Sequence, residues 1–238
     1  MTARRLLATG VLFALGFIAV ASAQDNPAVK PLNRDVPRHK QFLEKVKSGE
    51  GNVIFLGDSI TEGWEGNGKK AWAATFAPMK AVNLGIGGDQ TGHVLWRITE
   101  GKELEPLSPK VAVIMIGTNN GHSAENIAGG IKAIVEELRK QKPEMKILLL
   151  GVFPRGGGVG PKDDAPAEKL NKKIPAINEI IAKLDDGKYV FYKDIGKKFL
   201  DSDGTLTRKM MPDLLHLNPE AYEIWAAAIK EDVQKLAK

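Results

Sequence analysis

Short apolar runs of strand length alternate along this chain with longer segments in which apolar residues recur at helical spacing. The runs are continuously apolar, which indicates strands buried on both faces, as in a parallel sheet. We predict five strands, at Asn52–Leu56, Ala81–Leu84, Val111–Ile116, Lys146–Val152 and Tyr189–Tyr192. The clearest predicted helices are Ala124–Gln141, Ala167–Leu184 and Pro219–Leu236, with a shorter amphipathic helix from Arg38 to Lys47.

Regular alternation of strand and helix predicts right-handed crossovers between parallel strands. The expected fold class is therefore α/β, in the form of one three-layer α/β/α sandwich. In the last helix, the side chains of Tyr222, Trp225, Ile229 and Leu236 would form the buried stripe. The chain shows no internal repeat and no linker long enough to divide it.

The first 23 residues have a pattern of their own. Two arginines precede an apolar run that extends to about Val20, and Ala21-Ser22-Ala23 stands before Gln24. This pattern predicts a signal peptide over residues 1–23, cleaved after Ala23, and hence a secreted or periplasmic protein without a stable membrane span after processing. The alternative is an uncleaved membrane anchor, for which the run is short.

Composition limits the classes of partner and cofactor that we expect for this protein. The formal net charge of +5 at pH 7 falls to +3 without the two arginines of residues 1–23, and no basic block with interleaved aromatics points to nucleic acid. The four histidines show no metal-ligand spacing, and the chain has no cysteine, so we expect no metal and no cofactor. Residues 24–36, rich in Pro, Asn and charge, read as a lead-in to a domain over residues 37–238.

Polar and glycine residues follow three of the predicted strands at the point where each strand ends. These segments are Gly57-Asp58-Ser59, Gly85–Asp89 and Gly117–Asn120. The carboxyl ends of parallel strands meet at one edge of the sheet, where open α/β folds bind their ligands. Near the end of the chain, Asp213-Leu-Leu-His216 precedes Asn218-Pro219, which resembles a helix N-cap followed by proline at the first helical position.

These segments supply the parts of a nucleophilic site. A serine hydroxyl becomes reactive when a histidine takes its proton, and a carboxylate can fix the tautomer of that histidine. We predict Ser59 as nucleophile, His216 as base and Asp213 as its orienting acid. The donors for a tetrahedral oxyanion would be the backbone N–H of Ser59, the N–H of Gly88 and the side-chain amide of Asn119.

Each part taken alone has a plainer interpretation. The tripeptide Gly57–Ser59 is also a good turn and N-cap, because short oxygen-bearing side chains satisfy the free N–H groups of a helix's first turn. The Asp-x-x-His spacing also occurs in capping pairs. Gly87–Gly88 also fits an ordinary turn, and Asn119 also fits a hydrogen-bonded loop amide. Trp64 and Trp72 could line an acyl pocket, although aromatics at such spacing are more often core. The joint occurrence of the parts near strand ends favours the catalytic interpretation.

The same blocks resemble those of the SGNH (GDSL) hydrolases, named for Ser, Gly, Asn and His. The likeness is closer to the catalytic subunits of platelet-activating factor acetylhydrolase IB, through Asn83–Arg97, Gly117–Asn120, Gly129–Ile134 and Ser202–Thr205. The resemblance implies a flavodoxin-like sheet in strand order 2-1-3-4-5 and a metal-independent serine esterase with the roles given above. This chain departs from the mammalian subunits in its predicted signal peptide and in a Gly-rich loop at Arg155–Pro161, expected beside the site.

The expected function is hydrolysis of short acyl esters, most simply acetyl esters, on a small molecule or a polysaccharide. The alternatives are a lysophospholipase or thioesterase acting on longer chains, and a catalytically silent carbohydrate-binding protein that keeps the fold. An intact serine, histidine and aspartate set argues against the silent protein. The sequence leaves open the natural alcohol and the oligomeric state, a homodimer included.

Overall fold

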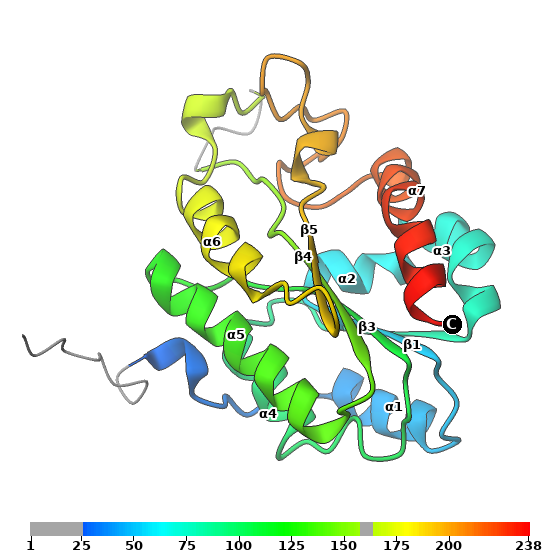
Figure 1. Cartoon of the computed structure of the whole chain (residues 1–238). Coiled ribbons are helices and arrows are strands. Elements are labelled where there is room, and N and C mark those ends of the chain that lie inside the picture. The colour runs from blue at the N-terminus through cyan, green and yellow to red at the C-terminus, as the bar shows by residue number, and fades with distance from the viewer. Residues whose placement is uncertain (1–25, 158–163) are drawn as a thin grey trace, which may run out of the picture.

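The computed structural model describes residues 26–157 and 164–238, so the predicted signal peptide and the end of the Gly-rich loop lie outside the described residues. Five parallel strands form one sheet in the order β2-β1-β3-β4-β5 (Figure 1). Their bounds are β1 Val53–Gly57, β2 Ala81–Gly85, β3 Val111–Met115, β4 Lys146–Leu150 and β5 Val190–Lys193. The predicted α/β class and strand order are confirmed.

Helices cover both faces of this sheet and make it the middle layer of a sandwich (Figure 1). The α-helices are α1 Pro37–Val46, α2 Ser59–Glu62, α3 Lys69–Thr75, α4 Thr91–Ile98, α5 Ala124–Gln141, α6 Lys173–Ile181 and α7 Pro219–Leu236. Short 3-10 helices lie at Pro27–Val29, Gly63–Glu65, Ala77–Met79, Ala167–Lys169, Ala182–Leu184 and Gly196–Phe199. Within residues 26–157 and 164–238, no helix is both long and apolar enough to cross a bilayer.

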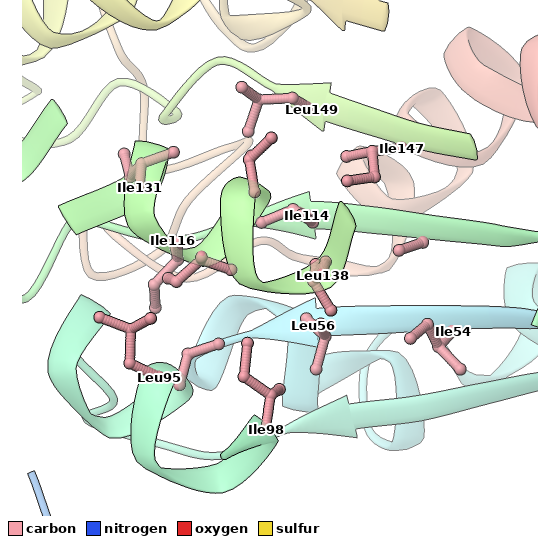
Figure 2. Close-up of a cluster of buried hydrophobic side chains, with 14 of the residues drawn as sticks. Ile54, Leu56, Leu95, Ile98, Ile114, Ile116, Ile131, Leu138, Ile147 and Leu149 are labelled. Carbon is pink, nitrogen blue, oxygen red and sulfur yellow. The ribbon is translucent and has the colours of Figure 1, made fainter. Parts of the chain in front are cut away.

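Strand periodicity divides the core into two clusters. Alternate residues of β1, β3 and β4 point to opposite faces, and on one face Ile54, Ile114 and Ile147 meet side chains of α4 and α5 (Figure 2). Because neighbouring strands are in register, with Ile54 beside Ala112 and Ala112 beside Ile147, these side chains form a continuous apolar layer. Burial on both faces explains why the runs are continuously apolar in the sequence.

The other face is built around aromatic side chains. Trp64 is 1% exposed, and its ring centroid lies 4.7 Å from those of both Tyr222 and Trp225 of α7. Trp72 packs against Trp64 at 5.8 Å, so both tryptophans belong to the core rather than to an acyl pocket. The stripe predicted for α7 is buried, apart from Leu236 at its last residue, which is partly buried.

One predicted helix is wrong at its start. The segment expected to be helical from Ala167 to Leu184 forms a short 3-10 turn, breaks at Leu170, and becomes α-helical only at Lys173. Pro175 lies in the first turn of α6 and would clash with the carbonyl of Asn171 if the helix extended further toward the N-terminus. The backbone upstream instead pairs with the loop after β4, where the Asn171 amide donates to the Arg155 carbonyl at 3.0 Å.

The lead-in packs along the surface of the domain. The Thr91 hydroxyl donates to the Ala28 carbonyl at 2.8 Å, and the Leu32 amide donates to the Gly92 carbonyl at 2.9 Å. Gly92 leaves room for this contact, because a Cβ at that position would lie 2.5 Å from the Lys30 carbonyl oxygen. Residues 28–32 are therefore held against the N-terminal end of α4, and the Asn26 side chain donates to the Asn126 carbonyl of α5 at 3.0 Å.

Candidate active site

Ser59 lies at the junction of β1 and α2. Asp58 is the N-cap of α2, where its Oδ1 accepts a hydrogen bond from the Ile60 amide at 3.0 Å. Gly57 makes this turn sterically feasible, because a Cβ there would lie 2.5 Å from the Met115 carbonyl oxygen. Gly-Asp-Ser is thus both a capping turn and the segment that presents a hydroxyl at the edge of the sheet, so the two interpretations of this tripeptide are compatible.

The serine, histidine and aspartate chosen from the sequence are in direct contact. The Ser59 Oγ lies 2.8 Å from the His216 Nε2, and the His216 Nδ1 lies 2.6 Å from the Asp213 Oδ2. Ser59 and His216 are 157 residues apart in the chain, so only folding brings them together. An Nδ1–H that donates to the carboxylate leaves the Nε2 lone pair facing the serine hydroxyl, as a base requires.

Asp213 is held by its own turn. Its Oδ1 accepts hydrogen bonds from the amides of Leu215 at 3.0 Å and His216 at 2.7 Å, while Leu214 between them adopts a φ of 62°. Partial burial raises the pKa of Asp213, but the hydrogen bonds from the backbone and ring of His216 and from Leu215 outweigh it, so the pKa lies below its usual value. The hydrogen bonds that hold Asp213 in its own turn therefore also keep it ionised beside the histidine.

The helix after the histidine begins as its sequence predicts. Asn218 is the N-cap of α7, its side chain accepting from the Ala221 amide at 2.8 Å, and Pro219 is the first helical residue. The described start of the Gly-rich loop contacts the same segment, because the Gly156 amide donates to the Leu214 carbonyl at 2.9 Å. That part of the loop lies beside the site, as expected.

The two glycines after β2 lie next to the nucleophile. A Cβ added to Gly87 would be 3.8 Å from the Ser59 Cβ, and the Gly87 amide donates to the Glu62 Oε2 at 2.6 Å. Gly88 adopts a φ of 79°, and its amide donates to no other group within the part of the chain that the structure describes. As the first residue of α2, Ser59 has no carbonyl one turn earlier to accept its own N–H. Both amides are available to a developing oxyanion.

Asn119 joins this group from the end of β3. Its side-chain Nδ2 donates to the Asp89 backbone carbonyl at 3.1 Å, and its backbone carbonyl accepts from the Gln90 side chain at 3.2 Å. A side-chain amide carries two N–H groups, so one is left after the bond to Asp89. Asn119 is thus a hydrogen-bonded loop amide and still has a donor to offer.

A buried carboxyl lies directly before the nucleophile. Burial raises the pKa of Asp58 to about 7, although the hydrogen bond from the Ile60 amide opposes the rise. The nearby charge of Asp89 raises it further, and that of His216 lowers it. Within the described residues, the Asp58 Oδ2 is buried without a hydrogen-bond partner. Burial therefore shifts this carboxyl toward its protonated form.

A network of charged side chains behind the glycine loop was not predicted. Its charged members, in order of contact, are the partly exposed Arg34 and the buried Asp89, Arg97 and Glu103, and the His39 ring lies beside Glu103. The available sequence signal is Arg97 itself, a charge inside the apolar helical run Val-Leu-Trp-Arg-Ile that forms part of α4. Although the network includes residue types that bind metals, no three His, Asp or Glu side chains in the described ranges are arranged to hold an ion.

A parallel α/β sandwich that carries Ser, His and Asp in contact at the carboxyl edge of its sheet has the architecture of an ester-cleaving hydrolase. The model of the GDSL-like lipase/acylhydrolase family matches residues 55–224. The human platelet-activating factor acetylhydrolase IB subunit alpha1 is 37% identical over 211 residues, which cover 84% of this chain and 87% of that protein. The chain therefore belongs to the GDSL-like lipase/acylhydrolase family and is an ester-cleaving enzyme.

Solved structures share the same fold. A protein from Bacteroides fragilis described as a candidate acylhydrolase superposes with a TM-score of 0.69 at 22% identity, covering 87% of this chain and all of its own. A carbohydrate acetylesterase from Sinorhizobium meliloti superposes with a TM-score of 0.58 at 20% identity, covering 79% of this chain and 100% of its own. At these identities the two structures show the fold alone.

Proposed function

We propose that this protein is a serine esterase that hydrolyses short acyl esters through Ser59, His216 and Asp213. The observation that carries the proposal is the unbroken contact from the Ser59 Oγ to the His216 Nε2 and from the His216 Nδ1 to Asp213. Family membership supports acyl ester cleavage, and this contact supports the assignment of roles to these residues.

The proposed chemistry follows from those contacts. His216 takes the Ser59 proton as the hydroxyl oxygen attacks the acyl carbon, and the resulting oxyanion accepts hydrogen bonds from the amides of Ser59 and Gly88 and from Asn119. The protonated His216 then gives its proton to the departing alcohol oxygen. Water, deprotonated by the same histidine, then attacks the acyl carbon. The bond from that carbon to the Ser59 Oγ breaks, His216 returns its proton to the Oγ, and the acid is released.

We propose acetyl as the preferred acyl group. The mammalian relatives of this chain are named acetylhydrolases, and a carbohydrate acetylesterase shares its fold. We expect kcat/KM on nitrophenyl esters to fall steadily from acetate through octanoate to palmitate. Acetylated xylan, assayed by acetate release, provides a polysaccharide substrate beside the small ester.

The two competing functions give different results in this series. A lysophospholipase or thioesterase would turn over octanoyl and longer chains faster than acetyl. A catalytically silent carbohydrate-binding protein would hydrolyse none of the esters and would bind xylan without releasing acetate. Either result would contradict the proposed preference for short esters.

We also propose export from the cytoplasm, with residues 1–23 as a signal peptide. The support is the sequence pattern of two arginines, an apolar run and Ala21-Ser22-Ala23. Mass spectrometry of the exported protein should find an N-terminus at or near Gln24. An intact Met1 chain in the membrane fraction would support the uncleaved anchor instead.

A further inference from the structure

We infer that Arg34, in the lead-in before the first helix, is a positioning residue that orients the Gly88 N–H toward the oxyanion. This inference rests on the proposed function. The Arg34 Nη2 donates to the Gly87 carbonyl at 2.5 Å, and the Arg34 Nε donates to the Asp89 Oδ1 at 2.7 Å. One guanidinium therefore contacts the residues on both sides of Gly88.

The geometry of the peptide bond makes the first contact directional. The Gly87 carbonyl and the Gly88 N–H belong to one planar trans peptide, in which the oxygen and the hydrogen point in opposite directions. No cis peptide is present among the described residues. A guanidinium that holds the carbonyl on one side therefore sets the direction of the N–H on the other. Polarisation of the peptide by the cation also strengthens its N–H as a donor.

A glycine loop needs such support. Gly88 adopts a φ of 79° and has no side chain, so its own sterics do not fix the orientation of the Gly87–Gly88 peptide. An oxyanion donor contributes most when it is already aligned before the reaction, because no energy is then spent on reorienting it. The guanidinium of Arg34 supplies this alignment from outside the loop.

The second contact connects both predicted oxyanion donors. The Asp89 side chain is fully buried between Arg34 and the Arg97 Nε, which lies 2.9 Å from its Oδ2. The backbone carbonyl of Asp89 accepts the Asn119 amide at 3.1 Å. Arg34 therefore holds the Gly87–Gly88 peptide through the Gly87 carbonyl, and it also holds Asp89, against whose backbone Asn119 is placed.

Arg38 offers a matched control. Its Nε donates at 2.7 Å to the carbonyl of Gly85, the last residue of β2, and its side chain is 21% exposed, against 24% for Arg34. The Gly85 carbonyl belongs to the peptide bond between Gly85 and Ile86. The N–H of that peptide already donates to the Gly57 carbonyl at 3.2 Å. Arg38 thus has a similar position and charge without contacting the peptide that carries the free donor.

The test compares Arg34→Gln, Arg34→Lys and Arg38→Gln with wild type on nitrophenyl acetate. Complete removal of one oxyanion donor costs about 10²–10³ in kcat elsewhere, so misalignment in Arg34→Gln should cost on the order of 10–10² with little change in KM. Arg34→Lys should keep part of the rate that Arg34→Gln loses. A lysine ammonium can donate to the Gly87 carbonyl but cannot also make the second hydrogen bond to Asp89 with a guanidinium's geometry. Arg38→Gln should keep kcat within about twofold.

Two further measurements separate alignment from general stability. We expect both glutamine variants to stay folded at the assay temperature, with the lower unfolding midpoint in Arg34→Gln because it leaves the buried Asp89 paired with Arg97 alone. The fluorophosphonate reaction at Ser59 should be slower in Arg34→Gln only. Three results would overturn the inference: unchanged kcat in Arg34→Gln, a rise in KM alone in that variant, or equal losses of kcat in both glutamine variants. None of them would contradict the proposed function, because the wild type would still be an active esterase. A wild type that neither reacts with the probe nor hydrolyses esters would instead overturn the proposed function, and this inference with it.

Discussion

Ser59→Ala is expected to lower kcat on nitrophenyl acetate by on the order of 10⁶-fold, the size of loss seen elsewhere when a triad nucleophile is removed. The Ser59 Oγ is the atom in contact with the His216 Nε2, and alanine leaves that base with no hydroxyl to activate. Stopped assays and fluorophosphonate labelling, read by mass spectrometry of the modified peptide, measure the loss. KM for any residual turnover should change little, because binding does not need the hydroxyl.

Ser108→Ala is a suitable control for this experiment. Ser108 is an exposed serine in the loop before β3, so its loss should leave both rate and labelling unchanged. Labelling that survives Ser59→Ala would show that another residue is the nucleophile. Loss of labelling in both variants would point to misfolding rather than chemistry.

Asp213→Asn is expected to lower kcat by about 10⁴-fold at neutral pH, as the corresponding change does in a serine protease triad. An asparagine amide facing the His216 Nδ1 favours the tautomer whose Nε2–H points at Ser59, so the ring can no longer accept the serine proton. The pKa of Asp213 lies below its usual value, so the wild-type carboxylate stays ionised from pH 6 to 10 and does not shape the pH profile there. Part of the variant's loss should return toward pH 10, where hydroxide can replace the base.

Asn119→Ala provides the contrast within the same experiment. It removes a donor rather than the base, so kcat should fall by about 10²–10³ at every pH between 6 and 10, with KM nearly unchanged. Parallel pH profiles for Asp213→Asn and Asn119→Ala would contradict the separate roles. If Asn119→Ala raises KM and keeps kcat, then Asn119 binds substrate and is not an oxyanion donor.

Much of the fold can be read from local patterns. Each predicted strand appears within a few residues of its expected place, because a strand buried on both faces must be continuously apolar wherever it occurs. The prediction fails at Ala167–Leu184, where helical periodicity is present but Pro175 and pairing with the loop after β4 delay the helix to Lys173. Local propensity is a weak preference that tertiary contacts can override.

The candidate site is predictable to a similar degree. Ser59, Gly88 and Asn119 follow strand ends, and parallel strands bring their ends to one edge, so the fold class already groups these residues. His216 and Asp213 come from a loop with no strand pattern, and their prediction rests on residue type and spacing. The observed contact of 2.8 Å between Ser59 and His216 goes beyond what spacing can show.

The sequence by itself determined the parallel α/β class, the places where the first three strands end and the residue types of the site. These features depend on apolar runs and turn residues, whose effect on the backbone is confined to a few neighbouring positions. Only the tertiary structure decided how those residues are held. Arg34 contacts Gly87 and Asp89 across 53 and 55 residues of chain, through hydrogen bonds that follow no helical or strand period. Such contacts depend on how the lead-in packs against α4, and this packing is determined by the whole fold rather than by any short segment.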